Sequence, residues 1–473
     1  MKIISKTLKF LPLFLFALVI ASCSNDDDGT PVLPQPQNIV EIAAGNSDLT
    51  SLVAALQAAD GDLVNVLSGS GPFTVLAPTN AAFATFLSDN GFSQLSDVPT
   101  DLLSQVLLNH VISADLTSGD LVGLGAGYTS TNATGVGGRN LSIYFNTDGG
   151  VEFNGISSVT PDGADIDASN GTIHIVDRVI GLPTIVDHAV ANPGFSNLVA
   201  ALGAADGDLV NVLSGAGPFT VLAPDNDAFV TFLDGTPLGD VPTDVLANIL
   251  LNHVIGSDVA SSSLVAAGAG YTNTLATGPN DNNLSLYYNT SDGVRFNGVS
   301  SVDQADVIGT NGIIHAVGTV IDIPSVVTFA TADPNFSTLV TALTDLTPAT
   351  DFVATLSTAN GTAPAPFTVF APTNAAFDAL DAIPAEDVLT QVLLHHVLDE
   401  ANVTSSDLIE SNGANPTMLN GQAITISVPG TGDNIADVTD GAGNTDVGIV
   451  AVDVQAGNGV IHVLNKVMLP SAD

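Results

Sequence analysis

The chain has 473 residues, 45% of them apolar, and a formal net charge of −42, with seven basic residues against 49 acidic ones. A negative field of this size repels nucleic acid and anionic lipid headgroups, so both are excluded as partners. The apolar content excludes a disordered acidic chain, and the length is sufficient for several packed domains.

The chain opens with the features of an export signal. Three lysines precede an apolar run at 10–20 that is too short to span a bilayer. Ile20-Ala21-Ser22-Cys23 then resembles the lipobox of bacterial lipoproteins, which implies a signal peptide at 1–22 and diacylglycerol on the Cys23 sulfur. The alternative is an ordinary signal peptide followed by an incidental buried thiol. Because Cys23 is the only cysteine, a disulfide within one chain is excluded in either case.

Residues 23–37 are expected to form the lipid attachment point and an acidic, proline-containing tether. The serine and acidic cluster at 24–28 resembles the surface-export signal of Bacteroidetes lipoproteins, and a merely solvated charge run is the alternative. We therefore predict an outer-membrane lipoprotein of a Gram-negative, Bacteroidetes-like cell that faces the exterior. Its contact with the membrane is predicted to be through the lipid on Cys23 alone.

The segment that follows reads as helices and then strands. Apolar residues at Leu49, Leu52, Val53 and Leu56 have the spacing of one helix face, whereas the run at 73–76 is bounded by prolines, as in a buried strand. Helices are predicted at 49–56, 62–67, 80–87 and 99–110, and strands at 73–76, 141–145, 151–153, 173–175 and 178–180. A helical half followed by a strand half predicts an α+β fold.

Three sequence blocks of this unit recur twice more, in the same order. They are Phe-Thr-Val-Leu-Ala-Pro-Thr-Asn-Ala-Ala-Phe at 73–83, Leu-Leu-Asn-His-Val at 107–111 and Asn-Gly-Thr-Ile-His at 170–174. Each block returns, with few changes, after 141 to 148 residues. A period this long is a whole domain, not a solenoid repeat. The predicted domains are 38–183, 184–324 and 325–470.

In this order the three blocks resemble the fasciclin domain family, and the resemblance covers about residues 38 to 470. It implies three tandem domains, each a seven-stranded β-wedge or sandwich flanked by helices, and a role in extracellular adhesion. In animal members a Tyr-His pair is associated with integrin binding. Here the residue before the first histidine of each copy is Asn109, Asn252 or His395, so integrin recognition is not carried over.

Each copy repeats two histidines and one aspartate. The first histidine lies on an apolar helical stripe and the second lies within a strand, so both are predicted to be structural residues of the core. The aspartate precedes the second histidine by nine residues, which fits a partner for the imidazole or a cap for the following turn. A metal site made from the two histidines and the aspartate is the alternative. These residues are His110, His253 and His396; His174, His315 and His462; and Asp165, Asp306 and Asp453.

Calcium is the one ion that the acidic composition suggests. The aspartates at 433, 437, 440 and 446 lie in a glycine-rich loop of the third copy without the register of a known calcium loop. The segment 165–176 has alternating oxygen donors, but it fails as an EF-hand because position twelve is a valine. Solvated turns are therefore predicted at both places, with no cofactor. Asp433, Asp437, Asp440 and Asp446 remain the calcium candidates.

No nucleophile elbow, zinc-binding helix or phosphate loop occurs in the sequence, so a non-enzymatic protein is predicted. The favoured hypothesis is a lipid-anchored protein that mediates cell adhesion or matrix binding, because tandem modules make weak contacts multivalent. Its partner would be a cell-surface or matrix polysaccharide or protein. The alternative is an accessory polysaccharide-binding lipoprotein of a nutrient uptake system. The absence of tryptophan and the presence of only five tyrosines argue against that alternative, because sugars usually stack on aromatic faces.

Overall fold

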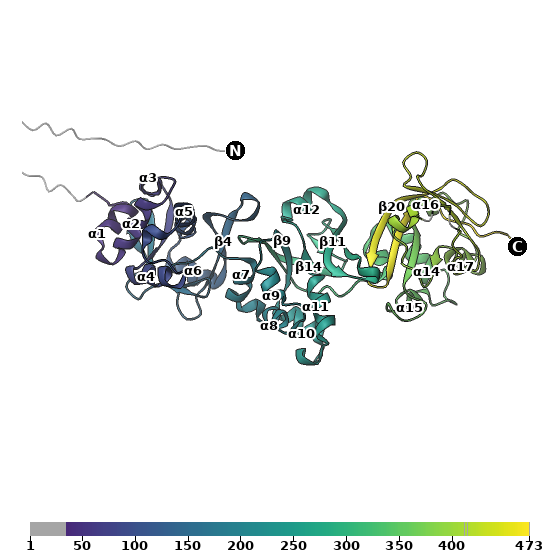
Figure 1. The fold of residues 1–473 in the computed structure, drawn as a ribbon, viewed down its shortest axis with the longest axis horizontal. Helices are drawn as coiled ribbons and strands as arrows, with labels where there is room; N and C mark the ends of the chain where they lie inside the picture. The colour runs from purple at the N-terminus through teal and green to yellow at the C-terminus, as the bar shows by residue number, and fades with distance from the viewer. Residues whose placement is uncertain (1–34, 411, 414, 473) are drawn as a thin grey trace, which may run out of the picture.

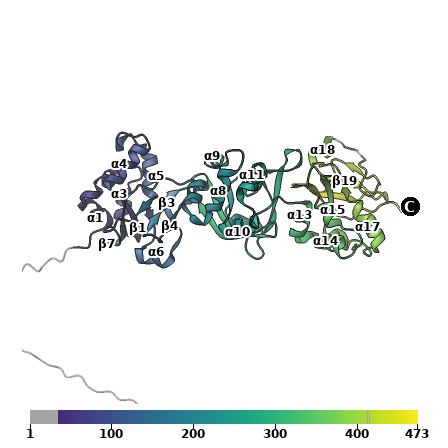
Figure 2. The ribbon, with the colours of Figure 1, turned by 90° about the horizontal axis from the view of Figure 1, so that it is seen from below.

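The computed structural model of the chain describes residues 35–410, 412–413 and 415–472. The predicted signal peptide, Cys23 and most of the tether lie outside these residues. Three mixed α+β modules follow one another along the long axis of the molecule, with the N-terminal module at one end and the C-terminal module at the other (Figures 1 and 2). The predicted fold class and the threefold repeat are confirmed.

The three modules have closely similar element orders. The first contains α1 (Ile39–Gly45), α2 (Thr50–Ala58), α3 (Leu63–Ser68), β1 (Phe73–Pro78), α4 (Asn80–Asp89), α5 (Thr100–Leu108), β2 (Val111–Ile112), α6 (Ser118–Leu124), β3 (Ala126–Thr134), β4 (Asn140–Asn146), β5 (Glu152–Phe153), β6 (Ser157–Ser158), β7 (Ile166–Ala168) and β8 (Gly171–Val176). The second contains α7 (Ile185–Ala191), α8 (Ser196–Ala204), α9 (Leu209–Leu213), β9 (Phe219–Pro224), α10 (Asn226–Leu233), α11 (Thr243–Leu251), β10 (Val254–Ile255), α12 (Ser261–Ala267), β11 (Ala269–Thr277), β12 (Asn283–Asn289), β13 (Arg295–Phe296), β14 (Ser300–Ile308) and β15 (Gly312–Val317). The third contains α13 (Val326–Ala332), α14 (Ser337–Thr344), α15 (Phe352–Leu356), β16 (Phe367–Pro372), α16 (Asn374–Asp378), α17 (Glu386–Leu394), β17 (Val397–Leu398), α18 (Ser405–Glu410), β18 (Thr425–Ser427), β19 (Ala436–Thr439), β20 (Val447–Ala456) and β21 (Gly459–Leu464). Short 3-10 helices lie at Ser47–Leu49, Leu95–Asp97, Val136–Gly138, Pro193–Phe195, Leu238–Asp240, Pro279–Asp281 and Pro334–Phe336.

Two of the repeated blocks form a parallel strand pair at the centre of each module. In the first module, β1 pairs with β8, so that Phe73 lies beside Gly171 and Leu76 beside His174. Gly171 has a φ of +147°, and a Cβ atom there would lie 1.9 Å from the carbonyl oxygen of Phe73. Only glycine fits this approach, which explains the glycine of the third block. The pairs β9 with β15 and β16 with β21 repeat the arrangement.

The strands around this pair differ among the modules. The second module has one seven-stranded sheet in the order β10-β9-β15-β14-β13-β12-β11, which is the strand number that the family resemblance implies. In the first module, β6 and β7 together occupy the place of β14, and the turn at 161–162 separates them. The result is two four-stranded sheets, β2-β1-β8-β7 and β3-β4-β5-β6. Among the described residues of the third module there are six strands, and none of them corresponds to β11.

The structure of the first module differs from the predicted helices and strands in several places: β2, α6, β6 and β7 were not predicted, and three further differences concern longer or misassigned segments. Helix α1 precedes the predicted first helix and begins at a capping box between Asn38 and Glu41. Strand β3 was not predicted, because its sequence, AGYTSTNAT, has few apolar residues. The predicted strand at 178–180 is wrong, since these residues form no regular strand. The backbone N–H of Ile180 instead donates to a histidine ring.

Helices and the parallel strand pair enclose the main core of each module. In the first module this core contains Leu52 and Leu56 of α2, Phe83 of α4, Leu107 of α5 and Ile173 of β8. A smaller cluster on the other side of the sheet includes Leu76 and Phe153. The chain therefore places two apolar layers against opposite faces of its central strands.

One junction geometry is used twice to join the modules. Strand β4 of the first module lies against β14 of the second, and β12 of the second lies against β20 of the third. At the first junction, the backbone N–H of Val136 donates to the carbonyl oxygen of Gly309 at 3.0 Å. A small apolar cluster that includes Leu141 and Ile308 closes this junction. The modules are thus packed against one another and are not only tethered.

Glycine makes the close approach at both junctions possible. A Cβ atom on Gly135 would lie 2.8 Å from the carbonyl oxygen of Gly309, and one on Gly278 would lie 2.8 Å from that of Ala456. Neither glycine has a positive φ, so the requirement is steric and not conformational. Gly135 and Gly278 occupy equivalent positions before β4 and β12, which indicates that the junction belongs to the repeat.

Candidate functional site

The first histidine of each module connects the helix that precedes it to the segment that follows the last strand. His110 follows α5, and its Nδ1 lies 2.7 Å from the carbonyl oxygen of Val106 in that helix. Its Nε2 lies 2.9 Å from the backbone nitrogen of Ile180. Because a backbone N–H can only donate, Nε2 accepts this bond, and Nδ1–H donates to Val106. The equivalent bonds are made by His253 to Ile249 and Ile321, and by His396 to Val392 and Met468.

Burial keeps these three imidazoles neutral. The loss of hydration lowers the pKa of His110, His253 and His396 from 6.5 to about 4, although the bond to the helix carbonyl opposes the shift. Both ring nitrogens are already used by the backbone. These rings therefore link segments of the module and offer no free nitrogen to a ligand.

The second histidine of each module connects the central strand to a loop that lies earlier in the chain, just before α6 or its counterpart. His174 in β8 has Nε2 2.9 Å from the carbonyl oxygen of Leu116, and its Nδ1 accepts from the backbone N–H of Asp165 at 3.3 Å. His315 repeats both contacts, to Val259 at 2.9 Å and to Asp306 at 3.2 Å. The imidazole contacts the aspartate mainly through the backbone N–H of the aspartate, because the carboxylate oxygen lies 4.0 Å from Nδ1 in both modules.

The third module departs from this pattern. His462 is bonded through Nε2 to the carbonyl oxygen of Val403 at 2.8 Å. Its Nδ1 is buried and has no hydrogen-bond partner among the described residues. The ring lies 5.6 Å from that of Phe370, centroid to centroid. Burial lowers the pKa of His462, so the ring is neutral at pH 7.

The repeated aspartate holds the start of a helix. The carboxylate of Asp165 accepts from the backbone N–H of Ser118 at 2.6 Å and also from its hydroxyl. The Ser118 hydroxyl and then its backbone N–H hold the pKa of Asp165 below its usual value. Asp306 accepts the same pair of bonds from Ser261. Asp453 does so from Ser405.

All three aspartates adopt a left-handed backbone conformation, with φ of 55°, 59° and 61° for Asp165, Asp306 and Asp453. Aspartate tolerates this conformation better than most residues. The carboxylate and the unusual backbone together explain why aspartate recurs nine residues before the histidine. The two histidines of one module contact different carbonyls, and the structure does not bring them together into one ligand set.

Three of the four aspartates of the acidic loop contact groups of the same module. Asp437 accepts from the backbone N–H of Thr431 and the amide of Asn434. Asp440 accepts from the amide of Asn444 and the backbone N–H of Leu469. Asp446 contacts Lys466, and Asp433 is exposed. No group of three or more His, Cys, Asp or Glu side chains within the described residues is arranged to hold a metal ion.

Sequence reasoning missed the role of one repeated asparagine. The Asn170 side chain accepts from the backbone N–H of Ile39 at 3.0 Å and donates to the carbonyl oxygens of Leu67 and Gly69. It thereby fixes the start of α1 and the end of α3 to the central strand. Asn311 and Asn458 make the corresponding bonds in the other modules. The threefold recurrence of Asn-Gly in the third block was the available signal.

The Fasciclin domain model matches residues 47–183, 193–324 and 334–470. The chain belongs to the fasciclin domain family. Proteins of this family are non-enzymatic adhesion and binding proteins, and this fasciclin chain is non-enzymatic. In each module, the position that a tyrosine takes in integrin-binding members is buried, and it holds Asn109, Asn252 or His395.

The fasciclin chain is similar to bacterial and animal proteins. It is 40% identical over 142 residues to Protein sll1483 of Synechocystis sp., which covers 30% of this chain and 72% of that protein. It is 26% identical over 414 residues to human periostin, covering 86% of this chain and 44% of periostin. It is 30% identical over 259 residues to transforming growth factor-beta-induced protein ig-h3 of Sus scrofa, covering 53% of this chain and 35% of that protein. The chain thus spans less than half the length of these two animal relatives.

Among solved structures, the chain is similar to a FAS1 domain pair from the insect cell adhesion molecule Fasciclin I. The two share 20% identity, the match covers 59% of this chain and 97% of that one, and the TM-score is 0.35. Within the described residues, no single helix is long and apolar enough to cross a membrane. The helices at Ile39–Gly45 and Ser47–Ala58 are long and apolar enough only when taken together, and the chain bends by 101° between them.

Proposed function

We propose that this fasciclin chain is a lipid-anchored protein of the outer cell surface that mediates adhesion to a cell-surface or matrix polysaccharide or protein. The family supports the binding role. The lipobox at Cys23 supports the anchor, and the acidic segment at 24–28 supports display at the exterior. The membrane is contacted only through the lipid on Cys23.

The observation that carries this proposal is the repeated packing of the modules. The same junction stacks the first module on the second and the second on the third, so the array is elongated (Figure 1). The first module follows the tether directly, and the third lies at the far end of the array. A stacked array presents three related surfaces at fixed separations, and this raises the effective concentration of the second and third contacts once one has formed.

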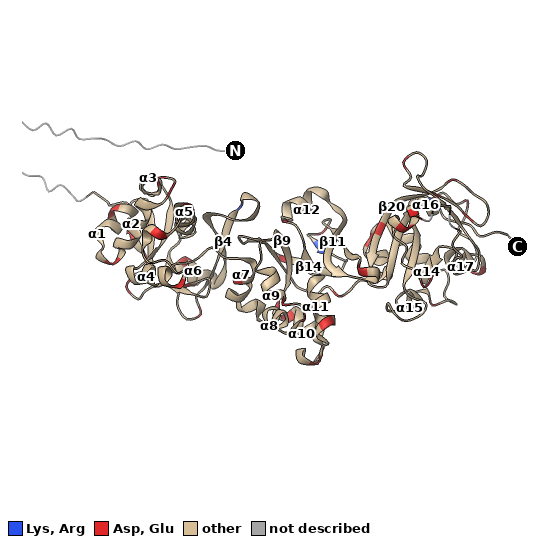
Figure 3. Cartoon of the chain, viewed as in Figure 1, with Lys and Arg blue, Asp and Glu red and all other residues tan. Residues whose placement is uncertain are grey.

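The charge of the array restricts its partner. Acidic residues occur on all three modules, whereas basic residues are visible at only a few places (Figure 3). After removal of the predicted signal peptide, four basic residues remain against 49 acidic ones. A neutral or cationic partner is therefore favoured over a nucleic acid or an anionic membrane.

The anchor is tested by metabolic labelling with a fatty acid carrying an alkyne. The unaltered chain is expected to incorporate the label and to be removed from intact cells by an added protease. Cys23→Ser should abolish labelling and release the protein from the membrane. Labelling that persists in Cys23→Ser would contradict the lipoprotein assignment, and protection from the protease would contradict an exterior location.

Adhesion is tested with cells that display one, two or three modules on the same anchor. If the modules act together, removal of two should weaken attachment by far more than two thirds. A loss in proportion to the number of modules would count against a multivalent array. The matched control is a three-module chain carrying Gly135→Ala and Gly278→Ala, which keeps every binding surface but disturbs both junctions.

The ligand class is tested by binding of the segment from residue 24 onward to its own cells and to a polysaccharide panel, with calcium or with a chelator. Binding to cells supports adhesion. Calcium dependence would direct mutagenesis to Asp433, Asp437, Asp440 and Asp446. Selective binding to one glycan without binding to cells would overturn adhesion in favour of nutrient capture.

A further inference from the structure

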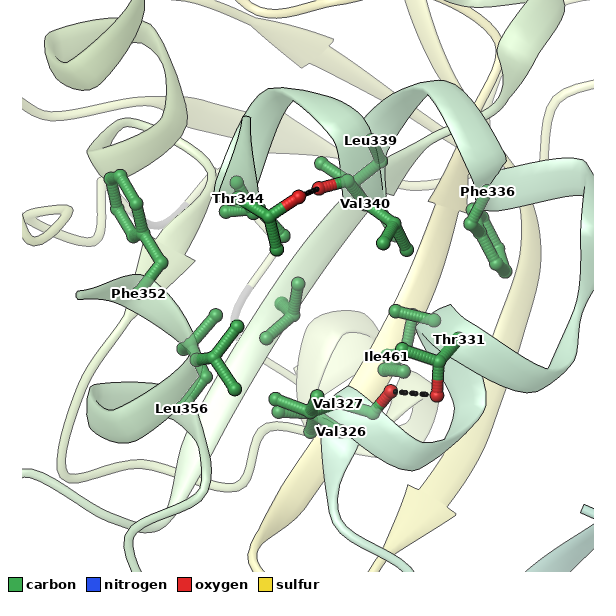
Figure 4. A pocket seen from close by; sticks show the side chains of 15 residues that line it. Val326, Val327, Thr331, Phe336, Leu339, Val340, Thr344, Phe352, Leu356 and Ile461 are labelled. Carbon is green, nitrogen blue, oxygen red and sulfur yellow. Dashed lines mark hydrogen bonds between the residues drawn. The ribbon is translucent and has the colours of Figure 1, made fainter. Parts of the chain in front are cut away.

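The third module contains an apolar cavity between three helices and the central strands. Helices α13, α14 and α15 form its walls, and β16 and β21 form its floor. Figure 4 shows side chains from these helices pointing into a common space above the strands, among them Val326, Leu339 and Leu356. The internal volume is about 100 Å³.

The lining of the cavity is chemically uniform. Thirteen of its fifteen residues are aliphatic or aromatic, and the other two are Thr331 and Thr344. The Thr331 hydroxyl donates to the carbonyl oxygen of Val327, and that of Thr344 to the carbonyl oxygen of Val340, both at 2.9 Å within their own helices (Figure 4). A bound water needs two to four polar partners, and this lining offers almost none. An engineered apolar cavity of about 150 Å³, somewhat larger than this one, stays dry and binds benzene.

The cavity has an opening to solvent between the helices. Val327 and Ala330 of α13 and Leu343 of α14 are only half-buried, and Val353 of α15 is 41% exposed. A ligand can therefore enter without unfolding of the module. No lysine or arginine lines the cavity, so nothing there would offset the charge of an anionic ligand.

The first module provides an internal comparison. A cavity at the same place shares much of this lining, including the counterparts Ile39, Leu56, Leu67 and Ile173, but its volume is only about 10 Å³. Two changes accompany the larger space. Val326 replaces the isoleucine found at Ile39 and Ile185, and seven residues separate α14 from α15 where four separate α2 from α3. The enlarged cavity is thus a local departure from a shared scaffold.

We propose that the third module binds a small neutral apolar group, the size of a single hydrocarbon ring, in the cavity between α13, α14 and α15. The uniform apolar lining excludes ligands that need hydrogen bonds inside the cavity. The lack of a cation at the opening and the acidic character of the whole chain exclude a carboxylate at the entrance. The ligand would lie beneath the helices, so this proposal does not depend on the adhesive role proposed above.

Benzene and benzoate are the matched probes, since they share a ring and differ in charge. We would use the full-length chain carrying Cys23→Ser, which removes a competing acyl chain. Benzene is expected to show saturation transfer to the protein and to raise the thermal midpoint by a few degrees, as a ligand of the folded state does. Benzoate is expected to do neither. Absence of benzene binding, or equal binding of benzoate, would overturn the proposal.

Two variants locate the site. Val326→Ile restores the isoleucine of the other modules, and Ala330→Leu fills the opening; each is expected to weaken benzene binding about tenfold or more. Val66→Ile adds the same methylene at a 45% exposed position in the first module and should leave binding unchanged. Unaltered binding in Val326→Ile would place benzene elsewhere and overturn the assignment. Because this variant is conservative, the test remains decisive even if Ala330→Leu does not fold.

Discussion

Ser142 and Ile308, which belong to neighbouring modules, are joined by a hydrogen bond of 2.9 Å from the backbone N–H of Ile308 to the Ser142 hydroxyl oxygen. The second junction repeats this bond at 2.9 Å, from the N–H of Gln455 to the hydroxyl oxygen of Ser285. In each case the serine belongs to the strand that the next module packs against. Without this bond, the N–H group of Ile308 or Gln455 would be buried without an acceptor. The serine of the preceding module supplies that acceptor.

Replacement of both serines is therefore expected to loosen the array. Ser142→Ala and Ser285→Ala each leave a buried N–H without its partner, at a cost of about 1–3 kcal/mol per junction. Small-angle scattering should show a broader distribution of sizes, while each module keeps its own fold. Ser88→Ala, at an exposed serine of α4, is the control and should leave scattering unchanged. An unchanged size distribution in the double variant would mean that other contacts maintain the stacking.

Steric contact is expected to matter more than charge at the first junction. Arg139 and Asp258 form an ion pair across it at 2.8 Å, but both side chains are 33% exposed. Such pairs contribute about 0–1 kcal/mol and are screened by salt. Arg139→Ala should thus have a small effect that disappears in high salt. Gly135→Ala, which places a methyl group 2.8 Å from a backbone oxygen, should separate the modules at any salt concentration. If Arg139→Ala separated the modules more than Gly135→Ala in small-angle scattering, charge would matter more than steric contact at this junction.

Acid is expected to destabilise the modules through their buried histidines. His110, His188, His253 and His396 have pKa values lowered by burial from 6.5 to about 4. Between these two pH values the unfolded chain binds protons that the folded chain does not. The free energy of unfolding therefore falls as the pH drops from 6.5 to 4, by roughly 3 kcal/mol per histidine, and is insensitive to these groups above pH 6.5.

Urea unfolding of the first module at pH 7.5, 6.0 and 5.0 measures this dependence. His110→Leu should lower stability at pH 7.5, because the N–H of Ile180 loses its acceptor. The same variant should show a shallower loss of stability between pH 6.5 and 5, because one titrating group is gone. An equally steep loss in His110→Leu would assign the acid sensitivity to other groups.

The sequence was sufficient for the repeated architecture and for most elements of the main core. Three recurring blocks revealed the modules, and the apolar spacing around Leu52 and Leu107 located two core helices. Strand β3 was beyond this reasoning, because its stability depends on its pairing with β4 and not on an apolar pattern. The predicted strand at 178–180 failed for the related reason that a short apolar run does not report whether a partner strand is available.

The site residues show the same division between local and distant causes. Spacing along a helix was enough to place His110 on an apolar face. The partner of Asp165 could not be read from the sequence, because Ser118 lies 47 residues earlier and is brought near only by the fold. The junction contacts of Ser142 and Gly135 were missed for the same reason. Even so, their equivalents Ser285 and Gly278 lie at the same places in the second module. An alignment of the three copies would therefore have shown that these two positions recur.

Substitutions of Asp306 would separate the two properties that favour aspartate at this position. One is the carboxylate that accepts from Ser261, and the other is the tolerance of a left-handed backbone conformation. Asp306→Ala removes both bonds to Ser261 and places an alanine at a φ of 59°. Asp306→Gly removes the same bonds but relieves the backbone, and Asp306→Asn keeps one acceptor oxygen and tolerates the conformation. We expect unfolding free energies to fall in the order Asn, Gly, Ala, with a loss of about 1–3 kcal/mol for alanine. Hydrogen exchange should quicken first in α12, whose start the carboxylate holds. Equal losses for Gly and Ala would show that the backbone conformation contributes little, and protection of α12 in all three variants would remove the carboxylate from its proposed role.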